Sequence, residues 1–125
     1  MAFSSEHFSE GELSCHCCGG FPENGIDDNL LSLLEDVRNA VDEPITVNCV
    51  YRCPSHNAEV GGVPNSQHVL GTAADVDVTS LSISVDHLAD IAVSLNADGV
   101  GRYDNFVHMD VRDGRVGSGY AWDER

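Results

Sequence analysis

The segment SQHVLGTAADVDV, residues 66–78, joins a polar turn to a strand-like run, and it decides the predicted fold. After the turn, apolar residues alternate with Asp75 and Asp77, which is the pattern of a half-buried β-strand. The inward positions would be Ala74, Val76 and Val78. His68 stands seven positions before Asp75, and Gly71 allows the chain to turn between them. A histidine and a carboxylate are thereby brought to one end of a predicted strand.

Two further segments carry the same alternation. In ITVNCVYR, residues 45–52, the pattern predicts an apolar face that includes Cys49, and a polar face that ends in Arg52. GVGRYDNFVHMDVR, residues 99–112, is typical of two strands joined at Asp104 and Asn105. Its polar face carries His108, Asp110 and Arg112. If these strands form one sheet, their polar faces assemble a single functional patch.

Helical patterns separate these strands. Asp27 or Asp28 can cap a helix whose apolar residues recur through Val41, Pro54 suits the start of a short helix, and residues 84–96 form an amphipathic helix. The predicted fold class is α+β, with a small antiparallel sheet and helices packed on one face. We expect residues 1–125 to form a single domain, with residues 1–25 as a cysteine-containing N-terminal segment.

The charge balance is strongly acidic. The chain has 21 acidic and 6 basic residues, a net charge of −15, and every basic residue is arginine. Such a surface repels itself unless salt screens it, which predicts a halophilic source. It offers no basic stripe for a nucleic acid. Because the sequence contains neither a long apolar run nor a signal-peptide pattern, we expect no membrane partner and a protein that stays cytoplasmic until lysis or is virion-associated.

The polar residues of the patch suit a metal ion. A catalytic zinc usually has three protein ligands and keeps its fourth position for water. His68, Asp75 and His108 form such a set, with two ligands in one loop-and-strand unit and the third on a facing strand. In a chain this acidic, Asp75 and Asp77 could instead be ordinary solvated carboxylates.

The same segments resemble a known superfamily. SQHVLGTAAD (66–75) fits the S-x-H-x-x-G-x-A-x-D signature of the zinc D-Ala-D-Ala carboxypeptidase and L-alanyl-D-glutamate endopeptidase superfamily, which shares its fold with the hedgehog signalling domain. FVHMDVR (106–112) is similar to its third-ligand strand, and YRCPSHNAEVGG (51–62) to the segment that carries an assisting arginine. HFSEGELSCHCCG (7–19) resembles the N-terminal segment of phage members.

This resemblance implies roles for individual residues. His68, Asp75 and His108 would bind Zn²⁺, Arg52 would stabilise an oxyanion or hold a substrate carboxylate, and Ser66 would contact the substrate. Several members of the superfamily place an acidic general base three residues before the last histidine, where this chain has Asn105. Asp110 is the favoured substitute as a catalytic base, Asp104 is the alternative, and Asp110 could equally orient an imidazole.

The chain contains five cysteines, so they cannot all pair within it. Cys15, Cys18, Cys49 and Cys53 could form a second, structural metal site, although their spacing is not that of common zinc knuckles. A buried thiol at Cys49 and a disulfide from the N-terminal cysteines to Cys53 are the alternatives.

The expected function is that of a zinc metallopeptidase that uses metal-activated water to cleave peptide bonds of a cell-wall or envelope polymer. The alternative is a zinc-binding structural or binding protein without turnover, for example a virion or tail component that contacts other virion proteins.

Overall fold

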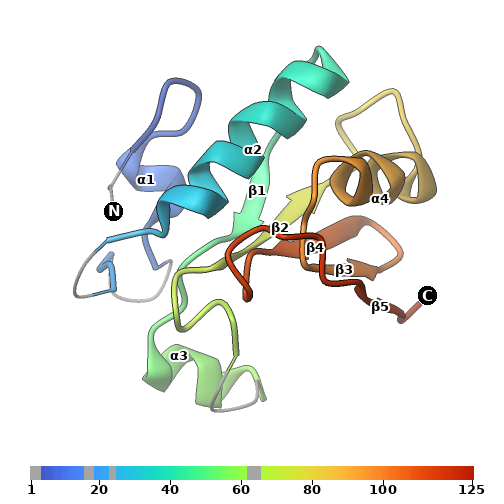
Figure 1. Ribbon diagram of the computed structural model, residues 1–125. Coiled ribbons are helices and arrows are strands. Elements are labelled where there is room, and N and C mark those ends of the chain that lie inside the picture. The colour runs from blue at the N-terminus through green and yellow to red at the C-terminus, as the bar shows by residue number, and fades with distance from the viewer. Residues whose placement is uncertain (1–3, 16–18, 23–24, 62–65) are drawn as a thin grey trace.

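The computed structural model describes residues 4–15, 19–22, 25–61 and 66–125 (Figure 1). Its helices are α1 (Glu10–Leu13), α2 (Asp28–Val41), α3 (Pro54–Glu59) and α4 (Val85–Ser94). Its strands are β1 (Val47–Cys49), β2 (Ala73–Asp77), β3 (Gly99–Arg102), β4 (Phe106–Asp110) and β5 (Tyr120–Asp123). The predicted α+β class is confirmed, as are the short helix from Pro54 and the β3–β4 pair.

The strands form one sheet in the order β1-β2-β4-β3-β5. Pairing is antiparallel from β1 to β3, as predicted, whereas β5 runs parallel to β3 along the edge. The sequence did not predict β5, because its four residues follow the glycine-rich stretch 114–119 and show no apolar and polar alternation. This strand brings residues 120–123 beside β3.

Helices α2 and α4 pack over one face of the sheet, and α3 lies apart from them near the β1 end (Figure 1). Asp27 caps α2 by accepting a hydrogen bond from the Asn29 N–H, and Ser84 caps α4 in the same way through the His87 N–H. Their apolar faces join the inward residues of the strands in one buried core. Among the described residues, no helix combines the length and apolar character needed to cross a membrane.

A bulge in β1 corrects one prediction from the sequence. Val47 pairs with Val76, but Cys49 pairs with Asp75, so β1 uses one residue more than β2 over this interval. The extra residue reverses the alternation of side chains. Cys49 therefore shares the face of Asp75 instead of the predicted apolar face, and Val50 is fully buried in the core.

A buried carboxylate positions the loop before β5. The Asp98 side chain accepts hydrogen bonds from the backbone N–H groups of Asp113, Arg115, Val116 and Ser118. Burial raises the pKa of Asp98, but these four donors outweigh it and hold that pKa below its ordinary value. The Asp98 carbonyl also accepts from Tyr120 N, the first residue of β5. One residue thus organises the loop and starts the edge strand.

Candidate metal centre

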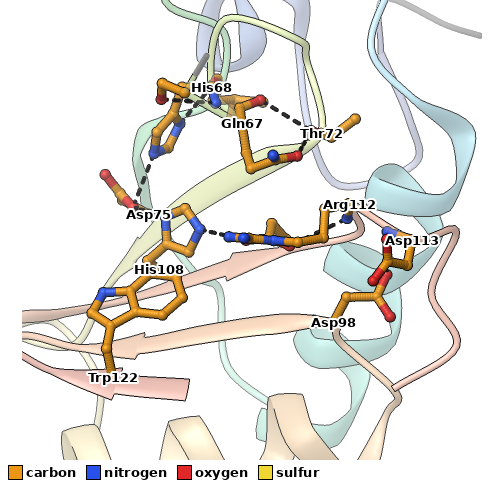
Figure 2. A network of polar contacts seen from close by, with 12 residues as sticks. Gln67, His68, Thr72, Asp75, Asp98, His108, Arg112, Asp113 and Trp122 are labelled. Carbon is orange, nitrogen blue, oxygen red and sulfur yellow. Dashed lines mark hydrogen bonds and ion pairs between the residues drawn. The ribbon is translucent and has the colours of Figure 1, made fainter. Parts of the chain in front are cut away.

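Two imidazoles and one carboxylate converge where β2 meets β4 (Figure 2). The strand register places Asp75 directly opposite His108, and the turn before β2 brings His68 to the same carboxylate. Asp75 Oδ1 lies 3.3 Å from His68 Nε2 and 3.3 Å from His108 Nδ1. The structure therefore places both predicted histidine ligands against one oxygen atom of the third predicted ligand, Asp75.

The far nitrogen of each imidazole is fixed by an acceptor. His68 Nδ1 lies 2.9 Å from the Val50 carbonyl, and His108 Nε2 lies 2.8 Å from Asp110 Oδ2. Because a carbonyl and a carboxylate can only accept, the proton of each neutral ring must be on that nitrogen. The two nitrogens that face Asp75 then carry lone pairs. Such partners orient the histidine ligands of metal sites.

The fit to a metal ion follows from the atoms in the centre. Asp75 Oδ1 is buried and has no hydrogen-bond partner among the described residues. An oxygen atom that faces two nitrogen lone pairs at 3.3 Å is repelled by both unless a cation lies between them. Two ligands of a tetrahedral ion with bonds of about 2.0 Å are about 3.3 Å apart. That separation equals both observed distances from Asp75 Oδ1.

The pKa values of His68 and Asp75 also favour a positive charge at this position. Burial lowers the pKa of His68, but the neighbouring Asp75 and Cys49 side chains outweigh it and raise that pKa to about 10. Burial raises the pKa of Asp75, but His108 and His68 outweigh it and lower that pKa to about 2. A positive charge between these groups is therefore favourable, whether a proton or a metal ion carries it.

The three described cysteines lie in two places. The Cys49 thiol lies near the candidate metal centre, because ligand atoms of Cys49, His68 and Asp75 all lie within 4.8 Å of one another. Cys53 instead lies beside Cys15, whose Sγ accepts a hydrogen bond from the Cys53 N–H at 3.3 Å. Cys18 is outside the described residues, so the site of Cys15, Cys18, Cys49 and Cys53 stays a prediction.

Arg52 and Ser66 lie together beside the metal centre. The Arg52 guanidinium donates to Asn57 Oδ1 at 3.0 Å and to Ser66 Oγ at 3.3 Å. Ser66 Oγ also accepts from the His68 N–H at 3.3 Å. Asn57 was not singled out from the sequence; its position on α3, five residues after Arg52, is the signal that could have identified it. This network fixes the guanidinium beside the turn that carries His68.

Asp110 is fully buried and does not face the cleft. Its carboxylate accepts from His108 Nε2 and from Arg112 Nε and Nη2, at 2.8, 3.0 and 2.7 Å. Burial raises its pKa, but His108 and Arg112 outweigh this and hold the pKa well below its ordinary value. Of the two roles left open for Asp110, this geometry favours orientation of the imidazole. Asp104 is exposed at the β3–β4 turn.

An open cleft of about 410 Å³ lies over these groups. Its lining residues are Arg52, Ser66, His68, Asp75, Tyr103, Phe106, His108, Arg112 and Trp122. Tyr103 and Phe106 stack with ring centroids 4.4 Å apart, and Trp122 Nε1 donates to the Tyr103 hydroxyl at 3.0 Å. No pattern in the sequence pointed to Trp122, because its place beside His108 depends on the parallel pairing of β5 (Figure 2).

Two glycines of β3 make room for this arrangement. A Cβ atom on Gly99 would come 2.7 Å from Asp110 Cγ, and one on Gly101 would come 2.7 Å from Trp122 Cζ2. Both separations are shorter than real Cβ contacts allow. The motif GVGR therefore leaves space for the carboxylate that orients His108 and for the indole beside it.

Comparison with known proteins is consistent with a zinc-binding site formed by these residues. Residues 6–110 match the sequence profile of the peptidase M15 family. A segment of 48 residues is 46% identical to the zinc D-Ala-D-Ala carboxypeptidase of Streptomyces albus G. The similar segment makes up 38% of this chain and 19% of that protein, so the likeness spans about a fifth of the relative's length.

Proposed function

The chain belongs to the peptidase M15 family, and from this premise we propose that it hydrolyses peptide bonds of a cell-wall or envelope polymer with a bound zinc ion. The ion would be held by His68 Nε2, Asp75 Oδ1 and His108 Nδ1. The observation that carries this proposal is the buried Asp75 oxygen, which faces two nitrogen lone pairs and has no hydrogen-bond partner among the described residues.

Zinc, when bound in such a site, lowers the pKa of a coordinated water to about 7 and polarises a carbonyl group. Because the water would already be acidic, the Asn at position 105 does not prevent hydrolysis. In this proposal Asp110 acts as a positioning residue that holds the His108 ring in its metal-binding orientation. Arg52 stabilises the developing oxyanion or holds a substrate carboxylate, and Ser66 supports that guanidinium and contacts the substrate.

Charge at the cleft favours an anionic peptide. Arg52 and Arg112 line it, in a chain with a net charge of −15, and the charge of Arg112 is partly balanced by the buried Asp110. A substrate carboxylate would therefore be attracted to this cleft and repelled by most of the remaining surface. Carboxypeptidase and endopeptidase activity both remain within the proposal, because the cleft is open and either substrate can present a carboxylate to Arg52.

The test combines metal content with turnover. The protein is purified in high salt, zinc is measured by elemental analysis, and hydrolysis is assayed on D-Ala-D-Ala dipeptides, muropeptides and envelope glycoprotein. We expect one zinc per chain at the site and cleavage of one of these substrates. His68→Ala should abolish both, whereas His87→Ala on the outer face of α4 should change neither.

Two results would contradict the proposal. If the protein contains no zinc even after incubation with excess metal, the proposed metal centre is refuted. Bound zinc without cleavage of any of these substrates would instead favour the alternative of a zinc-binding virion protein without turnover.

We also propose that the protein works at high salt. Arg102, Arg112, Arg115 and Arg125 each pair with an acidic side chain, and the excess of acidic residues is left to repel itself. The free energy of unfolding should therefore increase between 0.1 and 2 M KCl, as measured by urea titration. A free energy independent of salt would refute the halophilic proposal without affecting the metal centre.

A further inference from the structure

We propose that the Tyr103 hydroxyl, held in place by Trp122, binds a backbone carbonyl of the peptide substrate on the side of the metal centre opposite Arg52. This inference rests on the proposed hydrolysis and deepens it, because it names the class of peptide that the cleft accepts. The preferred substrate extends on both sides of the bond that is cleaved, with a carboxylate beside Arg52 and further acyl peptide beside Tyr103.

The strand register arranges a row of residues across the polar face of the sheet. Asp75 of β2 pairs with His108 of β4, and His108 also pairs with Gly101 of β3. Gly101 in turn pairs with Trp122 of β5. Paired residues share one face of a sheet, and Gly101 has no side chain to separate the other two. The indole of Trp122 therefore reaches across β3 toward His108, with ring centroids 5.0 Å apart (Figure 2).

The indole N–H determines the role of the Tyr103 hydroxyl. Trp122 Nε1 lies 3.0 Å from Tyr103 Oη. An indole N–H can only donate, so Oη is the acceptor and its own hydrogen stays available. No protein acceptor for that hydrogen is found in the described part of the chain. Because Tyr103 and Trp122 both line the cleft, this donor is available to a substrate there.

The ring that carries this hydroxyl is held from a second side. Tyr103 stacks on Phe106 with ring centroids 4.4 Å apart, and the Tyr103 N–H donates to the Phe106 carbonyl across the β3–β4 turn. The hydroxyl is thus fixed by the stack and by the indole before a substrate arrives. A donor that is already positioned loses little conformational freedom when a carbonyl binds to it.

The order of the strands puts this donor and Arg52 on opposite sides of the metal centre. The proposed ligands Asp75 and His108 lie on β2 and β4, which are neighbours inside the order β1-β2-β4-β3-β5. Arg52 follows β1, whereas Tyr103 follows β3. A peptide bond at the metal ion would therefore have Arg52 on one side and Tyr103 on the other.

The two groups select different chemistry. The Arg52 guanidinium is charged and suits a carboxylate, whereas the Tyr103 hydroxyl is neutral and suits an amide carbonyl. A site built to hydrogen-bond one substrate group discriminates against an analogue that lacks it. A free dipeptide has no carbonyl beyond the bond that is cleaved, so the Tyr103 hydroxyl distinguishes it from a longer, acylated peptide.

The test uses Trp122, the single tryptophan of the chain, as a fluorescent reporter of binding. The probes are analogues of D-Ala-D-Ala and of Nα-acetyl-L-Ala-D-Ala-D-Ala in which a CH₂ group replaces the N–H of the last amide, so that neither can be hydrolysed. They are titrated into the zinc-loaded full chain. We expect Tyr103→Phe, which keeps the aromatic ring, to bind the longer probe about five- to tenfold more weakly than the wild type, as for one lost hydrogen bond. Its zinc content and its affinity for the dipeptide analogue should be unchanged.

Two further variants complete the test. Tyr120→Phe is the matched control, because it removes a hydroxyl from β5 outside the cleft and should bind both probes like the wild type. Trp122→Phe, followed by calorimetry, removes the indole N–H and should weaken binding of the longer probe. That loss should disappear when Tyr103 is already phenylalanine, because Trp122 acts through the Tyr103 hydroxyl.

Two outcomes would overturn the proposal. One is equal affinity of the wild type and Tyr103→Phe for the longer probe. The other is a loss of affinity that is the same for both probes, because the substitution would then act on the whole site. Both outcomes leave the zinc site and the hydrolysis proposed above intact, since the probes report binding alone and a failure of hydrolysis appears in the activity assay instead.

Discussion

Replacement of Gly99 by alanine should weaken metal binding from a position outside the ligand set. The added Cβ would lie 2.7 Å from Asp110 Cγ, whereas ordinary contacts begin at 3.4 Å. Because Asp110 Oδ2 would lie closer still, the carboxylate must move by at least about 0.7 Å, or β3 must move away from β4. The hydrogen bond from His108 Nε2 to Asp110 is 2.8 Å long, so a retreat of this size is enough to break it.

The expected magnitudes follow from these contacts. Loss of the partner that orients a histidine ligand typically lowers metal affinity 10- to 100-fold. Overpacking at a buried position typically costs about 1–3 kcal/mol of stability. We therefore expect Gly99→Ala to reduce zinc affinity by one to two orders of magnitude, to a degree similar to Asp110→Asn. The double variant should be little worse than either single variant, because both changes disrupt the same hydrogen bond.

Zinc affinity is measured by competition with a chromophoric chelator, and stability by urea unfolding of the metal-free protein. Gly11→Ala is the matched control, because a Cβ there meets no atom closer than 3.9 Å. If Gly99→Ala is less stable but binds zinc like the wild type, the link through Asp110 to His108 is refuted. If the effects of Gly99→Ala and Asp110→Asn are additive, the two residues act independently and the reasoning also fails.

Three further predictions concern the same molecule. Arg52→Lys should lower the rate of hydrolysis about 100-fold with unchanged zinc content, because lysine cannot reproduce the forked guanidinium; an unaltered rate would exclude Arg52 from the chemistry. Removal of zinc by EDTA should lower the free energy of unfolding by about 2.7 kcal/mol when free zinc had been at 100 times its dissociation constant, and His68→Ala should not respond to EDTA. Asp98→Asn should cost about 2 kcal/mol at pH 7. The pKa of Asp98 is lower in the folded state than its unfolded value of about 3.9, so its contribution to stability is present above that pH and is lost as the pH falls through the folded pKa. The difference in free energy of unfolding between the variant and the wild type, measured by urea titration, should therefore shrink toward low pH.

The sequence predicted the helices and strands in which apolar and polar residues alternate with a clear period. The alternation in β2 and β4 placed Asp75 and His108 on one face, and the strand register confirms this placement. Two features could not be predicted, because they depend on pairing between strands. The bulge that moves Cys49 to the other face is an irregularity of register, and single-sequence alternation assumes a regular strand.

The aromatic residues that line the cleft, Tyr103, Phe106 and Trp122, were not predicted from the sequence, for a related reason. Trp122 is distant from His108 in sequence and approaches it only because β5 adds to the edge beside β3. The role of Asp110 was left open between base and positioning group, since a sequence cannot show burial or the hydrogen bond to Arg112. Tertiary contacts determined these outcomes, and local propensity did not.

The edge strand β5 supplies Trp122 to the wall of the cleft but none of the proposed metal ligands. The family profile ends at residue 110, whereas Trp122 and the loop held by Asp98 follow it. Because the three proposed ligands all precede β5 in the chain, this strand could be exchanged while the ligands are kept, together with Arg112, which holds Asp110. Grafting a different terminal strand onto β3 would reshape what the cleft accepts without rebuilding the centre beneath it, which makes this segment a natural starting point for engineering new selectivity.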